Sequence, residues 1–159
     1  MPSTPSARVS SSRLTIPNSS HYSPILKALK SSCSEAASKE VHRAISLEEA
    51  TRRIVEHEVQ SVILDNGLLL VYSVGSPWYS AKVILAEEMV LRIGEGGTFN
   101  DLCSLLDDLA DEYNVACTVV GTALARNDRA VARLYEHNGF HIDGSLCLVK
   151  RRDNGIHQA

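Results

Sequence analysis

The sequence lacks the features that mark membrane proteins, nucleic-acid-binding proteins and small disulfide-bonded proteins. Its apolar runs fall far short of the roughly 20 residues that cross a bilayer, so we expect no membrane association. The formal net charge is −3, and nothing in the composition indicates a nucleic-acid partner. No C-x-x-C pair occurs, which argues against a zinc ribbon or a disulfide framework. We therefore predict no metal site and a reducing, cytoplasmic location for the separate cysteines Cys33, Cys103, Cys117 and Cys147.

Acidic residues are also absent from the start of the chain, where none precedes Glu35. Residues 1–38 are instead rich in serine and proline, so they offer little apolar surface to offset the entropy lost on ordering. We predict that this segment is disordered or loosely ordered. An acid-free, serine-rich start with arginines is also typical of an organelle transit peptide, and that alternative stays open. Ile25, Leu26 and Leu29 have helical spacing and predict a short helix over residues 23–32.

The rest of the chain, residues 40–152, has the length and composition of one ordinary globular domain. Period-2 and 3.6-residue apolar patterns predict its helices and strands. The predicted helices cover residues 47–58 and 102–113 and a third segment that opens at Asn127 and closes before Gly139. The predicted strands cover residues 60–65, 68–74, 82–86, 115–121 and 145–150. Residues 153–159 are predicted to form a frayed tail.

Hairpin-linked strands come first in this order, and a strand–helix–strand crossover follows. A crossover of that kind is right-handed and makes its two strands parallel. The expected fold class is therefore α/β, with a mixed central sheet and helices on its faces. The third strand can continue to residue 93, although the neighbouring acids Glu87 and Glu88 interrupt its apolar run.

Three short signals predict where individual elements begin and end. Ser46 and Glu49 have the spacing of a capping box at the start of the first domain helix. The dipeptide Asn66-Gly67 is typical of a type I′ turn between two hairpin strands. Gly139 stands where a helix-ending glycine is expected, and an apolar residue follows it.

A glycine-rich loop joins the third predicted strand to the clearest predicted helix. It reads Arg92-Ile93-Gly94-Glu95-Gly96-Gly97-Thr98, and Thr98 or Asn100 can cap the helix that follows. The amides and dipole of a helix N-terminus favour an anion, and glycine lets the backbone approach a pyrophosphate closely. A flexible connection is the plainer interpretation. Glu95 favours it, because a carboxylate repels phosphate.

The last predicted helix carries a second motif, over residues 127–140, which reads N-D-R-A-V-A-R-L-Y-E-H-N-G-F. This pattern resembles the last helix of the GNAT superfamily of N-acetyltransferases, N-x-x-A-x-x-L-Y-E-x-x-G-F. The loop that begins at Arg92 is similar to that superfamily's R/Q-x-x-G-x-G/A, and the order of elements agrees from residue 40 to residue 152. Two positions depart from the pattern. Glu95 replaces a family glycine, and Asn127 lies one residue further from Tyr135 than usual.

The resemblance implies a GNAT-like mixed sheet that holds acetyl-CoA between two splayed parallel strands. It also implies that an amine, on a small molecule or a protein, attacks the thioester directly. Tyr135 matches the tyrosine that protonates the leaving thiolate, and our candidate base is Glu88, followed by Glu87. A core position for Tyr135 and a solvated one for Glu88 are the plainer interpretations. The cofactor contacts would come from Arg92, Gly94, Gly96, Gly97, Thr98, Asn127 and Arg129.

A narrower resemblance links the compact layout to small GNAT-like proteins of podovirus-type bacteriophages. Some of those have lost the catalytic machinery and serve as virion components or bind host proteins. A degenerate member that acts by protein–protein contact in the host cytoplasm is therefore the alternative function. Trp78 and Tyr79, after Pro77, predict an aromatic loop tip that either serves recognition or covers the core. The fold also leaves open a homodimer that pairs through sheet edges.

Overall fold

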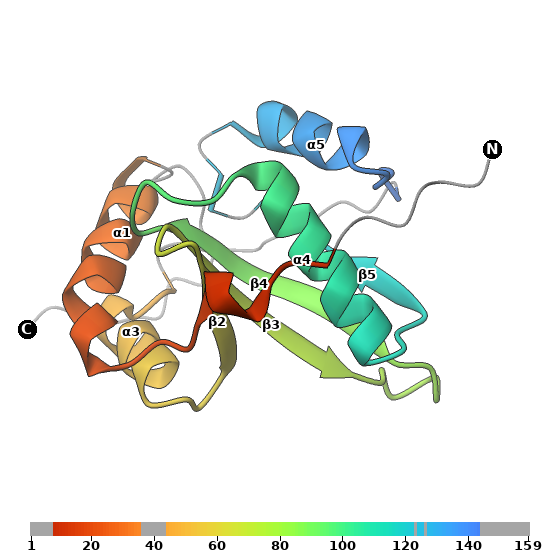
Figure 1. Cartoon of the computed structure of the whole chain (residues 1–159), viewed down its shortest axis with the longest axis horizontal. Helices are drawn as coiled ribbons and strands as arrows, with labels where there is room; N and C mark the ends of the chain where they lie inside the picture. Colours follow the sequence, from red (N-terminus) through yellow and green to blue (C-terminus); the bar gives the residue numbers. More distant parts are fainter. Residues whose placement is uncertain (1–7, 36–43, 123, 126, 144–159) are drawn as a thin grey trace, which may run out of the picture.

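A computed structural model describes residues 8–35, 44–122, 124, 125 and 127–143. Within these residues the centre is a sheet whose strands lie in sequence order (Figure 1). The first four strands pair antiparallel and the last joins its neighbour in parallel, which confirms the mixed sheet expected from the sequence. The strands are β1 (Leu14–Thr15), β2 (Gln60–Leu64), β3 (Leu68–Gly75), β4 (Ile84–Arg92) and β5 (Cys117–Val119).

Helices cover both faces of this sheet. The α1/α3 face is covered by α1 (Tyr22–Glu35) and α3 (Leu47–Val55). The α4 face is covered by α4 (Phe99–Glu112), which connects the parallel strands β4 and β5, and by α5 (Asp128–His137). In Figure 1, α4 crosses the sheet, α1 and α3 lie together at one end, and α5 lies at the upper edge.

Strands β2 and β3 are buried on both sides. Ile63 and Leu69 belong to the core of the α1/α3 face, whereas their neighbours Leu64 and Leu70 belong to the core of the α4 face. Successive strand residues point to opposite faces, so a strand between two helical layers needs an unbroken apolar run. This explains why the sequences of these strands do not alternate between apolar and polar residues.

The helix α4 follows its sequence pattern closely. Leu102, Leu105 and Leu106 are buried against the sheet, at the spacing that the 3.6-residue repeat predicts. Of the two candidate caps, the structure uses Thr98. Its hydroxyl accepts from the Asp101 amide, and its own amide donates to the Asp101 carboxylate. This reciprocal pair fixes the start of α4 at the end of the glycine loop.

The prediction of little order before residue 38 is wrong for residues 8–35. The segment holds two short 3-10 helices (Ser11–Arg13 and Ser19–His21), and β1 and α1. The predicted short helix is confirmed and is longer than expected. Ile25 and Leu29 are completely buried against the α1/α3 face. Two well-placed apolar residues can order a serine-rich segment when a second helix and a sheet complete their packing.

The β2–β3 turn lies one residue earlier than predicted. The residues with positive φ are Asp65 (49°) and Asn66 (54°), and the Gly67 amide donates to the Leu64 carbonyl at 3.0 Å. Aspartate and asparagine tolerate this left-handed conformation better than other residues with a side chain. Gly67 is therefore required at its position for a different reason, which is close packing against the glycine loop.

The predicted end of α5 and the predicted start of α3 at Leu47 are confirmed, but the predicted capping box of α3 is wrong. Gly139 has a φ of 89°, as expected for the residue after a helix. The capping box at the start of α3 does not form, because the Ser46 side chain makes no cap hydrogen bond. Glu49 instead accepts hydrogen bonds from Arg52 and Arg53 on the next turn of α3.

Strand β5 is shorter and more exposed than predicted. It covers three residues rather than residues 115–121, and Val119 is 52% exposed. The predicted strand at residues 145–150 and the tail after it lie outside the described residues. Among the described helices, none combines the length and the apolar character needed to cross a membrane.

Candidate functional site

The two adjacent glutamates of β4 lie on opposite faces of the sheet, as successive strand residues do, and a β-bulge at Glu88 places Glu88 and Met89 on the same face. The β3–β4 register pairs Val71 with Met89 and Tyr72 with Glu87, so Glu88 is an extra residue with no partner in the register. Glu87 lies on the α4 face beside Tyr135, whereas Glu88 lies over the α1/α3 face beside Met89. The polar interruption in the sequence therefore marks the bulge, and β4 continues through it.

Strands β4 and β5 part at this bulge. Their parallel pairing ends at Ala86 and Val119, and the next residue of β4 is Glu87. The Glu87 carboxylate accepts a hydrogen bond from the Gly121 amide at 3.0 Å and another from the Tyr135 hydroxyl. Within the described residues, β4 has no strand partner on its β5 side from Glu87 to Arg92. An extended ligand could pair with these backbone groups.

Tyr135 is held in an aromatic cluster next to the point where β4 and β5 separate, which we call the splay. Its side chain is only 4% exposed and lies edge-on to Phe99 and Phe140, with ring centroids 4.7 and 5.1 Å apart. Burial, followed by the charge of Glu87, raises the pKa of the Tyr135 hydroxyl well above its usual value. Burial also raises the pKa of Glu87. Tyr135 therefore keeps its proton at neutral pH and donates it in a hydrogen bond to Glu87.

The glycines of the loop after β4 pack against the β2–β3 turn. A Cβ added to Gly96 would lie 1.8 Å from the Asp65 carbonyl oxygen, and one added to Gly94 would lie 2.3 Å from that of Asn66. A Cβ on Gly67 would meet the Gly96 carbonyl oxygen at 1.7 Å. Contacts this close leave no room for any side chain. Loop-to-turn packing alone accounts for glycine at these positions.

Arg92 fixes the orientation of the loop backbone. Its guanidinium donates to the carbonyl oxygens of Gly94, Gly96 and Gly97 at 3.0 to 3.1 Å. A trans peptide directs its N–H away from its C=O, so the amides of Glu95, Gly97 and Thr98 face away from Arg92. This orientation suits a phosphate group on the outer side of the loop.

Two charged side chains of the protein, Asp101 and Arg13, also lie at the start of α4, beside the glycine loop. The Asp101 carboxylate accepts from the Thr98 amide and lies 3.1 Å from the Arg13 guanidinium. Arg13 also binds Asp65 through two nitrogens. The pKa of the Asp101 carboxyl is lowered, first by its hydrogen bond with the Thr98 hydroxyl. A diphosphate at this loop would find the amides of Glu95 and Gly97 turned outward, and the Thr98 amide already bonded to Asp101.

The structure gathers the predicted site residues into separate groups. Arg92, Gly94, Gly96, Gly97 and Thr98 form the loop, and Tyr135 lies beside Glu87 at the splay rather than beside Glu88. Asn127 caps α5, since its Oδ1 accepts from the Ala130 amide at 3.0 Å, and Arg129 is exposed on the first turn of that helix. In the described part of the chain, no hydrogen bond or ion pair links either residue to the loop.

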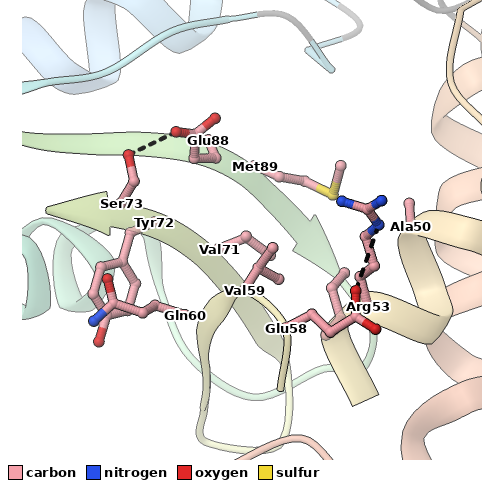
Figure 2. A pocket seen from close by; sticks show the side chains of 11 residues that line it. Ala50, Arg53, Glu58, Val59, Gln60, Val71, Tyr72, Ser73, Glu88 and Met89 are labelled. Atoms are coloured by element: carbon pink, nitrogen blue, oxygen red, sulfur yellow. Dashed lines mark hydrogen bonds and ion pairs between the residues drawn. The ribbon is translucent and has the colours of Figure 1, made fainter. Parts of the chain in front are cut away.

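A pocket of about 570 Å³ opens on the α1/α3 face and was not expected from the sequence. Figure 2 shows Glu88 at one side of it, with its carboxylate bonded to the Ser73 hydroxyl at 2.7 Å. Arg53 and Glu58 lie at the other side, 3.7 Å apart, and apolar side chains lie between. The acidic interruption of β4 was the one sequence signal for this pocket, because the bulge there places Glu88 and Met89 side by side at its edge.

Two solved structures share this arrangement of strands and helices, although no protein-family model and no curated protein matches the sequence. One is a crystal structure of "a probable acetyltransferase", with a TM-score of 0.59, 14% identity, and coverage of 88% of this chain and 97% of that one. The other is "a possible acetyltransferase from Clostridium difficile 630", with a TM-score of 0.62, 12% identity, and coverage of 87% and 97%. The chain shares the fold of these two structures. At this identity the likeness shows the fold alone and leaves the reaction to be argued from the site.

Proposed function

We propose that the protein transfers an acetyl group from acetyl-CoA to an amine. The observation that carries this proposal is the placement of two proton-handling groups around one point of β4. Tyr135 contacts Glu87 at the splay on the α4 face, and the next residue, Glu88, faces a pocket on the other side of the sheet. A thioester lying in the splay would have a proton donor on one side and a carboxylate base on the other.

The chemistry then follows from the roles of these side chains. The amine nitrogen attacks the thioester carbonyl carbon, so a carbon–nitrogen bond forms as the carbon–sulfur bond breaks. The amine proton passes to the Glu88 carboxylate, and the leaving thiolate takes the proton of the Tyr135 hydroxyl. Exchange with water restores both groups. The amides that face away from Arg92 would hold the diphosphate, whereas Asn127 and Arg129 lie on α5 without a contact to this loop in the described part of the chain.

Thiol release from acetyl-CoA in the presence of amines tests the proposal. We expect Glu88→Gln and Tyr135→Phe each to lower kcat by about 100-fold, a usual effect of losing a general acid or base. Phenylalanine keeps the ring contacts with Phe99 and Phe140, so the second variant removes only the hydroxyl. The exposed Glu136, replaced by glutamine, is the matched control and should leave kcat unchanged.

A second function, protein binding on the same fold, is favoured by two specific observations. Tyr135 is almost fully buried, and the Glu87 carboxylate accepts a hydrogen bond from the Gly121 amide where β4 and β5 begin to separate. Trp78 and Tyr79 are 96% and 72% exposed at the tip between β3 and β4, where a partner could touch them. If calorimetry detects no acetyl-CoA binding at millimolar ligand, the transferase proposal is overturned and the binding function takes its place.

A further inference from the structure

The pocket on the α1/α3 face has charged ends and an apolar middle. Glu88 and Ser73 form one end, on β4 and β3. Arg53 and Glu58 form the other end, next to the start of β2. The surface between them is mostly apolar and is made of Ala50, Ile54, Val59, Val71 and Met89, and Gln60 and Tyr72 complete the lining. A ligand that fills the pocket therefore needs a hydrocarbon middle and two polar ends.

The arginine at the far end is already matched by carboxylates. Arg53 donates to Glu49 at 2.8 Å and lies 3.7 Å from Glu58. Arg52 also contacts Glu49 and Glu58, and it contacts Glu56 as well. Two guanidinium groups thus face three carboxylates, which leaves one negative charge at this end. An anionic ligand would have to compete with these carboxylates for Arg53, whereas a cationic ligand would neutralise the remaining negative charge.

The near end is also negative. Glu88 is exposed, and the one partner recorded for its carboxylate in the described part of the chain is the neutral hydroxyl of Ser73. The two acidic ends lie on opposite sides of β3. Strands β4 and β2 are two strand spacings apart, about 10 Å, and Glu58 lies two residues before the start of β2, so a ligand that reaches both ends must be extended.

We propose that this pocket binds a linear alkyl diamine, with one amine at Glu88 and the other at Glu58. The inference rests on the proposed function in one respect, because it makes the amine at Glu88 the nitrogen that receives the acetyl group. The amine at Glu58 stays charged and sets the position of the chain. Glu58 is thus a specificity residue that does not touch the reacting atoms.

Three probes of similar length test the charge pattern directly. Cadaverine carries a second amine at its far end, n-pentylamine carries none, and aminovalerate carries a carboxylate. Calorimetry without acetyl-CoA should show cadaverine binding up to about fivefold more tightly than n-pentylamine, as expected for one added ion pair at an exposed carboxylate. Aminovalerate should bind most weakly. In the acetyl-transfer assay, kcat/KM should follow the same order.

A pair of glutamate-to-glutamine variants, one in the pocket and one outside it, locates the effect. Glu58→Gln should weaken cadaverine to the level of n-pentylamine, raise its KM and leave kcat unchanged. Glu48→Gln, on an exposed position of α3 outside the pocket, should change none of these values. A purely structural role for Glu58 would weaken all three probes alike, and that result would overturn the inference.

The remaining outcomes separate this inference from the proposed function. Equal binding of cadaverine and n-pentylamine, or preferred binding of aminovalerate, overturns the diamine inference even if acetyl transfer to amines is observed. Cadaverine binding that depends on Glu58, without any thiol release from acetyl-CoA, supports the pocket assignment while the transferase proposal fails.

Discussion

Replacing Gly67 by alanine should destabilise the protein through a clash between two backbone segments. The added Cβ would lie 1.7 Å from the carbonyl oxygen of Gly96, whereas a carbon and an oxygen in contact normally stay about 3.3 Å apart. The turn and the glycine loop would have to separate by about 1.5 Å, and neither side offers a flexible side chain that could yield. We expect a loss near the upper end of the roughly 1–3 kcal/mol typical of overpacking.

Urea denaturation followed by far-ultraviolet circular dichroism measures this loss. With a slope of about 1–3 kcal/mol per molar urea, the midpoint should fall by about 1–3 M at unchanged slope. Gly75→Ala is the matched control, since it lies at the other end of β3 and a Cβ there has no neighbour within 4 Å. Neither glycine has positive φ, so conformational strain does not separate the two variants. Equal midpoints for Gly67→Ala and Gly75→Ala would refute the packing of the two segments.

Two further perturbations test other parts of the structure. Ile25→Ala should cost about 2–5 kcal/mol because Ile25 is completely buried, while the exposed Lys27→Ala should be near neutral; an unaffected midpoint for Ile25→Ala would contradict the ordered N-terminal segment. Glu87→Gln should become more stable relative to the native chain as pH rises from about 4.5 to 7. The folded-state pKa of Glu87 is raised above its ordinary value of 4.5, so its contribution to the stability of the native chain is complete below pH 4.5 and is lost as the carboxyl ionises at higher pH. A difference in unfolding free energy between Glu87→Gln and the native chain that does not change with pH would contradict this reasoning.

The elements with strong periodicity were predictable from the sequence. The apolar stripe of α4 (Leu102, Leu105, Leu106 and Leu109) and the parallel crossover from β4 to β5 both appear as expected. These predictions succeed because an amphipathic helix needs only one apolar face, and handedness then fixes the crossover. In contrast, Ile25 and Leu29 were too few to outweigh a serine-rich composition, and only the packing of α1 on α3 and β4 shows why the segment is ordered.

The candidate site was less predictable, because its chemistry depends on register. Alternation along β4 puts the adjacent residues Glu87 and Glu88 on opposite faces, but the sequence reveals neither which of them faces Tyr135 nor the bulge that places Glu88 beside Met89 in the pocket. The glycines 94 and 96 fit both a phosphate-binding loop and a tightly packed turn, and the sequence does not contain the neighbouring turn at residues 65–67. Close approach between segments 30 residues apart is a tertiary property, so local patterns do not reveal it.

The exposed loop tip also determines what tryptophan fluorescence can report for this protein. Trp78 is the single tryptophan of the chain, and its ring is already in water in the native fold. Its emission should therefore change little when the core melts, and a fluorescence titration would miss a cooperative transition that circular dichroism detects. The same ring would respond strongly to any macromolecule that covers the tip, so the native chain carries its own optical probe for a docking partner.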